Sequence, residues 1–444
     1  MTSLTHLSQM FFLIALISGV GFFIYNVRKI FRNINLGRPI DRTDDPESRW
    51  ALMARVALGQ SKMVVRPIAG FLHILVYVGF IIINLEMLEI IIDGLFGTHR
   101  VFSFLGGFYD FLIGSFEILA LLVIIAVGAF WVRRNIHKLQ RFWKPEMKGW
   151  PKNDANYILY IEFALMVLFL GMNAADYYAH AKQDVALAGA FPVSKNLFFF
   201  FDSFGIGTLQ VMERVFWWMH ILGVLFFLNY LYYSKHFHIL SAFPNVWFAK
   251  LRPKGELDNL ASVTSEVKLM MDPNADPFAA PAPGAEMAEP ETFGAKDVFD
   301  LNKVQLLNAY TCTECGRCTS ECPANLTGKK LSPRKIMMDT RDRLEDVGAN
   351  IDKNNGKFVD DGKKLIGDYI SAEEIWACTS CNACVQACPV NIDPLSIIMD
   401  IRRYLVMEES AAPMELNLMM QNVENNGAPW QFNNSDRLNW AEEA

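Results

Sequence analysis

The chain has 444 residues, of which 52% are hydrophobic and 20% are charged, and its formal net charge is −6 at pH 7. This length predicts two or three domains, and the mild negative charge argues against a nucleic-acid partner. The long apolar runs all precede residue 240, whereas all eight cysteines follow residue 310. The composition therefore predicts a membrane-spanning part followed by a polar part that contains every cysteine.

Five apolar runs are long enough to cross a bilayer, which needs about 20 residues. They lie at 7–27, 67–92, 112–132, 157–179 and 212–235. The first run has no basic residue before it and no small-residue cleavage site after it, so we interpret it as a retained helix rather than a signal peptide. Residues 1–250 are thus predicted to form a five-helix transmembrane domain.

The loops between these runs alternate in charge. Nine Lys or Arg residues lie at 28–66 and seven at 133–152, whereas the loops at 93–111 and 180–211 carry one and two. By the positive-inside rule the basic loops are cytoplasmic. The N-terminus is then outside, and everything after Lys235 is cytoplasmic. The expected location is the cytoplasmic (inner) membrane.

Histidines at membrane depth are candidate haem ligands, because an ionisable side chain within a bilayer indicates function. His73 lies early in the second predicted helix and His238 follows the fifth, at the same depth. Two histidines on different helices are what a b-type haem between helices requires. On a continuous helix His238 shares a face with His220, and His236 is the interfacial residue. The alternative is that His73 and His238 both lie near lipid headgroups.

The outer end of the bundle has a second group of polar residues. His220 is a candidate for a second haem or for a quinone site. A tentative quinone site consists of Asn84, Glu86 and Glu117, whose carboxylates would exchange protons with a quinol. Glu213 is seven residues from His220 and nearly on its face. The alternative is that Glu86 and Glu213 are solvated helix ends.

The polar part begins after a segment rich in Pro, Ala, Glu and Asp at 251–300, which is predicted to be a linker. A mostly α-helical domain is expected at 301–413, and an acidic tail at 414–444 is predicted to dock on a neighbour. Helices within the domain are expected at 304–310, 332–344 and 394–407.

The eight cysteines form two copies of the motif C-x2-C-x2-C-x3-C-P. This spacing is typical of proteins with two [4Fe–4S] clusters, in which the fourth cysteine ligates the other cluster. The predicted ligand sets are Cys312, Cys315, Cys318 and Cys388 for the first cluster, and Cys378, Cys381, Cys384 and Cys322 for the second. Zinc sites favour C-x2-C pairs a dozen or more residues apart, and disulfides favour small secreted chains.

Both halves resemble known families. The segments AYTCTECGRC from Ala309, WACTSCNAC from Trp376 and IRRYLV from Ile401 resemble the dicluster ferredoxin domain of heterodisulfide-reductase-type proteins. The membrane half, including YSKHFHI from Tyr233, is similar to the cytochrome b (gamma) subunit of respiratory nitrate reductase. In that family His73, His220 and His238 fall where three of four haem histidines are expected.

Two differences from these families shape the functional prediction. Ile83 stands where the fourth haem histidine is expected, so one haem is expected rather than two. No cysteine follows Cys388, so the cysteine-rich catalytic repeats of heterodisulfide reductases are absent from this chain. The resemblance implies that a separate cytoplasmic cysteine-rich oxidoreductase subunit supplies the catalytic site.

The sequence therefore predicts an all-α electron-transfer subunit in the membrane, with no catalytic residue assigned. Electrons would pass between the quinone pool, a b-type haem and two [4Fe–4S] clusters, to or from the partner subunit. Two alternatives stay open. One is a complete heterodisulfide-type reductase, and the other is a membrane-anchored redox sensor without haem.

Overall fold

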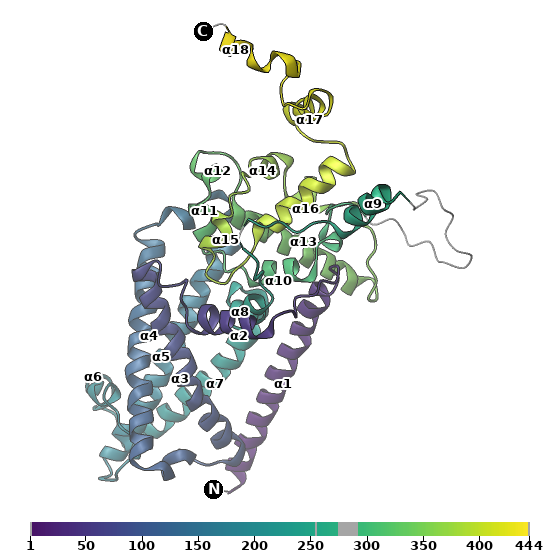
Figure 1. Cartoon of the computed structure of the whole chain (residues 1–444). Helices are drawn as coiled ribbons and strands as arrows, with labels where there is room; N and C mark the ends of the chain where they lie inside the picture. Colours follow the sequence, from purple (N-terminus) through teal and green to yellow (C-terminus); the bar gives the residue numbers. More distant parts are fainter. Residues whose placement is uncertain (1, 254, 274–291, 443–444) are drawn as a thin grey trace.

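The computed structural model describes residues 2–253, 255–273 and 292–442 (Figure 1). Within these ranges every regular element is a helix, and β-structure is limited to two isolated bridges. Part of the predicted linker, namely Lys254 and 274–291, lies outside the described residues. The prediction of an all-α fold is confirmed for the part of the chain that is described.

Five helices are long and apolar enough to cross a membrane. They are α1 (Thr2–Ile34), α3 (Pro67–Phe96), α4 (Gly107–Asn135), α5 (Trp150–Ala181) and α7 (Ile206–Tyr230). Each contains most or all of one predicted apolar run and is longer than it, because backbone hydrogen bonds continue past the first charged residues. Large apolar side chains such as Phe11 and Ile14 are exposed on the outside of the bundle, as contact with lipid requires.

Each spanning helix of the bundle packs against two others. Helix α5 lies against α4 and α7, α3 against α4, and α1 against α3 and α7. Gly19 allows α1 to approach Leu225, and Asn229 donates a hydrogen bond to the Gly19 carbonyl oxygen (3.0 Å). Gly94 likewise lies beneath the ring of Phe12. The N-terminus of α1 lies at the end of the bundle opposite the cysteines, which we name the distal end (Figure 1).

The fifth span does not continue as one helix to its end. After α7 the backbone becomes extended at Ser234 (φ −120°, ψ 148°), and a new helix, α8, covers His238–Trp247. Asp154 of α5 stabilises this break, since it accepts hydrogen bonds from the Ser234 hydroxyl (2.7 Å) and the Lys235 amide (3.1 Å). The prediction that His220 and His238 share a face of one continuous helix is therefore wrong.

The cysteines belong to a helical domain at the other end of the bundle, which we name the cysteine domain (residues 292–413). Its main helices are α10 (Lys303–Thr311), α13 (Pro333–Lys353) and α16 (Pro394–Met407), and its short helices are α11 (Arg317–Ser320), α12 (Pro323–Leu326), α14 (Ala372–Trp376) and α15 (Ala383–Ala387). Asn302, Ser332 and Asp393 cap the three main helices. Ala295 and Val298, which the predicted linker includes, are buried in this domain's core.

The cysteine domain is fixed to the bundle by buried polar contacts. The Asn33 side chain donates to the Tyr310 hydroxyl (2.9 Å). Arg334 is fully buried and pairs with Glu146 (2.6 Å), which lies in the loop between α4 and α5. Ile30 of α1 is part of the same apolar core as the cysteine domain. The two parts therefore form one packed structure at this junction.

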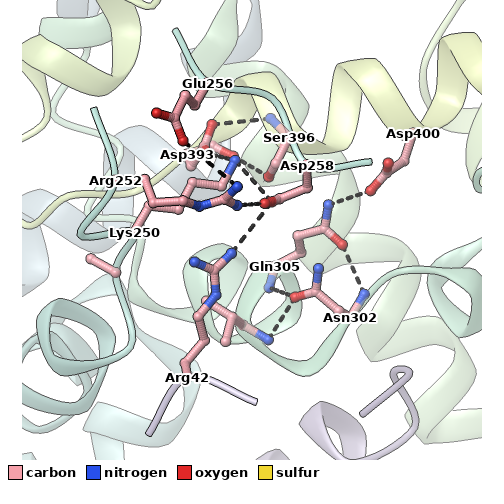
Figure 2. A network of polar contacts seen from close by, with 12 residues as sticks. Arg42, Lys250, Arg252, Glu256, Asp258, Asn302, Gln305, Asp393, Ser396 and Asp400 are labelled. Atoms are coloured by element: carbon pink, nitrogen blue, oxygen red, sulfur yellow. Dashed lines mark hydrogen bonds and ion pairs between the residues drawn. The ribbon is translucent and has the colours of Figure 1, made fainter. Parts of the chain in front are cut away.

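The first part of the predicted linker also takes part in the junction. Figure 2 shows Asp258 within reach of Arg42 (3.4 Å), Lys250 (3.1 Å) and Arg252. Lys250 also pairs with Asp393 (3.2 Å), which precedes α16. These ion pairs hold the chain after α8 against the cysteine domain and against the loop after α1.

The remaining helices lie at the periphery. They are α2 (Pro46–Met53), α6 (Phe198–Phe201), α9 (Ala261–Met271), α17 (Met414–Asn426) and α18 (Asn439–Glu442). Helix α2 packs on α8, where the Trp50 and Trp247 rings lie 4.4 Å apart. Helices α17 and α18 extend away from the cysteine domain, and Trp430 and Trp440 are exposed (Figure 1). Docking of this tail on a neighbour stays a prediction.

Candidate metal centres

The two cysteine motifs form loops with the same backbone course. Glu314 (φ 54°) and Gly316 (φ 71°) are left-handed in the first loop. The corresponding Ser380 (φ 56°) and Asn382 (φ 59°) are left-handed in the second. Non-glycine residues rarely adopt this conformation, so its occurrence at matching positions indicates that both loops are shaped for the same ligand.

The structure brings the first predicted ligand set together. One cavity of the cysteine domain is lined by Cys312, Cys315, Cys318 and Cys388, and also by Cys384 of the second set. Burial raises the pKa of Cys312 to about 12 and that of Cys388 to about 11. Free thiols with such pKa values are poor nucleophiles, whereas a bound metal would deprotonate them. The donor set therefore fits an iron–sulfur cluster better than covalent catalysis.

The second predicted set also gathers. Cys378 interacts electrostatically with Cys322 and Cys381, and Cys384 interacts with Cys378 and Cys322. Within the described ranges no three His, Cys, Asp or Glu side chains converge as the ligands of a single metal ion would. The four thiolates of a cubane bind four iron atoms and surround a larger volume. Cys381 is exposed, so this set reaches the protein surface.

Backbone amides and charged side chains complete each centre. The Ile392 amide donates to Cys388 Sγ (3.3 Å), and the Ser380 amide donates to Cys378 Sγ (3.4 Å). Arg317 interacts with Cys315 and Cys388, and Arg402 interacts with Cys378. Hydrogen bonds and positive charge near the sulfurs raise the reduction potential of a cluster.

The first loop is bound to the membrane part through Glu314. This residue is 3% exposed and pairs with Arg341 (2.8 Å) and with Lys235, which follows α7. Burial raises the pKa of Glu314, but the charges of Lys235 and Arg341 outweigh burial and hold that pKa below its usual value. Ser380, at the same position of the second loop, is uncharged. Sequence reasoning missed Glu314 because both partners are distant in the chain.

Two of the predicted haem histidines lie together at this end of the bundle. His73 of α3 interacts electrostatically with His238. His73 Nδ1 is buried and has no hydrogen-bond partner among the described residues. His238 Nδ1 lies 3.0 Å from the Lys235 carbonyl oxygen, which leaves Nε2 for a metal. Burial lowers the pKa of His238 and favours the neutral imidazole that binds iron. Neutral imidazole nitrogens are the chemistry of axial haem ligands, and haem binding by this pair stays a prediction.

His236 differs from the prediction of an interfacial residue. Its side chain is only 12% exposed and lies 3.5 Å from Glu162, with its ring 5.1 Å from that of Phe227. The His236 and His238 rings stand 5.4 Å apart and nearly perpendicular. The break at Ser234 turns both side chains inward, which a continuous helix would not do.

His220 lies deeper in the bundle. It is 3% exposed, and its Nδ1 lies 3.1 Å from the Leu165 carbonyl oxygen. This contact also leaves Nε2 for a ligand. Its assignment to a second haem or to quinone stays a prediction.

The distal end holds the three residues of the predicted quinone site, but not as one group. Asn84 is exposed and bonds back to the Phe80 carbonyl oxygen. Glu86 is buried and interacts electrostatically with Glu117, and each has one carboxyl oxygen without a hydrogen-bond partner in the described structure. The alternative that Glu86 and Glu213 are solvated helix ends is wrong, since they are 4% and 8% exposed.

Sequence reasoning missed further members of this distal group. Glu89 accepts hydrogen bonds from the Tyr109 hydroxyl (2.9 Å) and the Phe102 amide (2.9 Å). Buried Arg100 pairs with Asp176 (2.9 Å). The 86, 89, 93 spacing of acidic residues on an apolar helix was an available signal. The cavity between these residues is about 30 Å³, which holds one water molecule but no quinone ring.

Comparison with known proteins agrees with the cysteine geometry. Residues 311–392 match the family model described as a 4Fe-4S dicluster domain. The chain therefore contains a 4Fe-4S dicluster domain in its C-terminal part. The chain is 29% identical over 120 residues to one component of the "Ferredoxin/F(420)H(2)-dependent CoB-CoM heterodisulfide reductase" of Methanosarcina acetivorans. This match confirms the predicted resemblance of the cysteine motifs to heterodisulfide-reductase-type proteins. That match covers 27% of this chain and 60% of the relative.

Two longer relatives match most of the chain. It is 30% identical over 465 residues to a "Probable iron-sulfur-binding oxidoreductase FadF" of Bacillus subtilis, covering 98% of this chain and 61% of that protein. It is 25% identical over 420 residues to an "EtfAB:quinone oxidoreductase" of Syntrophomonas wolfei, covering 87% of this chain and 53% of that protein. The chain thus spans a little over half the length of these relatives. No solved structure matches.

Proposed function

We propose that this chain is a membrane-bound electron-transfer subunit. It relays electrons between the quinone pool, a b-type haem and two [4Fe–4S] clusters, to or from a separate cytoplasmic oxidoreductase. The observation that carries the proposal is the proximity of the candidate haem ligands to the first cysteine set. His73 interacts electrostatically with Arg317, and Arg317 interacts with Cys315 and Cys388. The candidate haem ligands in the bundle thus adjoin the first cysteine set.

Each group of side chains has a defined role in this proposal. The clusters and the haem supply one-electron transfer when bound. His73 and His238 provide axial nitrogens, and the Lys235 carbonyl oxygen orients the His238 ring. The cluster ligands are Cys312, Cys315, Cys318 and Cys388 for the first cluster, and Cys378, Cys381, Cys384 and Cys322 for the second. The exposure of Cys381 supports exchange with a partner at the second cluster.

The quinone assignment has two supports, and because the distal cavity of about 30 Å³ admits only water, the quinone ring would bind outside that cavity. One relative is named an EtfAB:quinone oxidoreductase. In this chain the distal end holds buried Glu86 and Glu117, each with an unpartnered carboxyl oxygen among the described atoms, and His220 with Nε2 available. Carboxylates of this kind accept protons when a quinol is oxidised. Asn84 is left out of this site because it faces outward.

Orientation and partner complete the proposal. The basic loops next to the cysteine domain support a cytoplasmic location for that domain and an N-terminus on the outer side. A relative that is named as one component of a heterodisulfide reductase supports a multi-subunit setting. The tail at 414–444, which is largely exposed over its described part, is the segment that would dock the partner.

The test is a visible absorption spectrum with iron and haem quantification on the purified full chain. We expect about eight non-haem iron atoms and one b-type haem with a Soret band. His73→Ala and His238→Ala should each remove the Soret band and keep the cluster iron. His180→Ala, a histidine at the distal end, is the matched control and should retain haem. About eight iron atoms without any haem would overturn the haem assignment and leave the clusters intact.

A further inference from the structure

Another cavity lies beside the cysteine domain, where α3 begins and α4 ends. Its volume is about 440 Å³, and it is separate from the cavity lined by the cysteines. Three arginines line it, Arg66 before α3, Arg133 at the end of α4 and Arg141 in the following loop. The remaining lining is mainly aliphatic. We name this space the arginine cavity.

The positive charge of the arginine cavity is poorly compensated. Arg66 pairs with the exposed Glu321 (2.9 Å). Within the described part of the chain, Arg133 and Arg141 have no carboxylate partner, and the Nε of Arg141 is buried without a hydrogen-bond acceptor. Burial, together with the nearby charges of Arg66, Arg317 and Arg133, lowers the pKa of Arg141 to about 10. An anion in the cavity would relieve the repulsion among these arginines.

The aliphatic lining indicates which kind of anion fits. Val65 and Ile68 are 76% and 64% exposed beside the arginines. They lie where two membrane-spanning helices end, which is the depth of lipid headgroups. A free inorganic anion would satisfy the arginines but would leave this apolar surface in water. A lipid phosphate satisfies the arginines while its glycerol and acyl chains cover the aliphatic residues.

We propose that the arginine cavity binds the phosphate group of an anionic phospholipid from the adjoining leaflet. The guanidinium groups of Arg133 and Arg141 contact the phosphate oxygens, and Val65 and Ile68 contact the start of the acyl chains. This site is independent of the haem and quinone assignments.

The bound headgroup would also adjoin the first cysteine loop. Arg66 donates to the Ser320 hydroxyl of α11 (2.7 Å), and Arg141 interacts electrostatically with Cys315. A Cβ atom at Gly316 would lie 3.3 Å from the Cβ of Arg141, so this loop packs directly on the cavity wall. The lipid thus bridges the bundle and the cysteine domain.

Native mass spectrometry of the detergent-purified full chain tests the proposal. Phosphatidylglycerol is titrated against phosphatidylcholine, which has the same phosphate but no net charge. The test variant is Arg133→Gln/Arg141→Gln. The control variant Lys138→Gln/Lys148→Gln removes two charges from exposed lysines of the same loop that do not line the cavity.

The wild-type chain should bind phosphatidylglycerol more tightly than phosphatidylcholine. The double arginine variant should lose about fivefold in affinity per arginine, or about 30-fold in total, and the lysine control should change little. Arg133→Gln alone should lose about fivefold, and it keeps the proposal testable if the double variant does not fold.

Three outcomes would overturn the proposal. Equal loss in the lysine control would show a diffuse surface charge effect. Equal binding of both lipids would show that the arginines do not select an anion. Complete displacement of phosphatidylglycerol by excess inorganic phosphate would assign the cavity to a free anion instead of a lipid.

Discussion

The two cysteine loops share their spacing and their left-handed positions, yet their surroundings differ. The first loop lies against the membrane part, with Glu314 paired to Lys235 and Arg317 bonded to the Lys62 carbonyl oxygen (2.9 Å). The second loop reaches the surface at Cys381. Two equivalent ligand sets in different surroundings suit two clusters that pass electrons one after the other. One would face the bundle and the other would face a partner. The predictions below test how a change at the first loop differs from a change at the second.

The largest effect, the loss of a whole cluster, is expected when the fourth cysteine of a motif is replaced. In the proposed sets Cys388 completes the first cluster and Cys322 completes the second. Cys388→Ala should therefore remove the first cluster, and iron should fall from about eight to about four atoms per chain. Cys322→Ala should do the same to the second cluster. Electron paramagnetic resonance of the reduced variants distinguishes the two signals.

One result would contradict the proposal that the fourth cysteine of each motif ligates the other cluster. If Cys388→Ala and Cys378→Ala removed the same signal, each motif would bind its own cluster and the proposed sets would be wrong. Cys378 and Cys388 belong to one motif in the sequence but to different sets in the proposed assignment.

A large stability effect is expected at Glu314. Glu314→Gln leaves the buried Lys235 and Arg341 without a carboxylate, and removal of one partner from a buried ion pair costs about 3–5 kcal/mol. Ser380→Ala, at the matching position, should cost under about 1 kcal/mol. Chemical denaturation followed by cluster absorbance measures both.

The pH dependence gives a second readout for Glu314. Its folded-state pKa lies below its unfolded value, so its contribution to stability is present above the unfolded pKa and is lost as pH falls through the folded pKa. The wild-type chain should lose this stability in acid, and Glu314→Gln should not show this loss. An unchanged acid profile in the variant would contradict the role of the ion pair.

Some of these features could be predicted from the sequence and others could not. The cysteine sets and the spans follow from spacing and apolar length, which are local patterns. Helix α16 was predicted at its observed bounds because Asp393 caps it and Pro394 begins it. The domain class and the ligand candidates were therefore accessible from short segments of the chain.

The break after α7 could not be predicted from a local sequence pattern. No proline or glycine lies in Leu231–His238, and the break is held by Asp154 from another helix. A contact between residues about 80 positions apart leaves no periodic signal. Glu314 and its partners Lys235 and Arg341 escaped prediction for the same reason.

A moderate loss of stability is expected from a substitution of Gly316, the second left-handed residue of the first loop. A Cβ at Gly316 would lie 2.6 Å from the Arg334 side chain and 3.3 Å from Arg141 Cβ, at φ 71°. Gly316→Ala should therefore cost about 1–2 kcal/mol for the conformation alone, and more for the contact with Arg334. Asn382→Ala, at φ 59° in the second loop, should cost about 1 kcal/mol or less. Equal losses of unfolding free energy would contradict the tighter packing of the first loop.

The smallest effect should be a shift in reduction potential. It tests whether the surroundings of each cluster set its reduction potential independently. Arg317 lies by the first set and Arg402 by the second. Loss of one positive charge makes the added electron less stable, so Arg317→Gln should lower the potential of the first cluster by on the order of 50 mV. Arg402→Gln should lower that of the second cluster by a similar amount. Redox titration with electron paramagnetic resonance separates the two, and a common shift of both clusters in either variant would mean that the surroundings act on the pair as one centre.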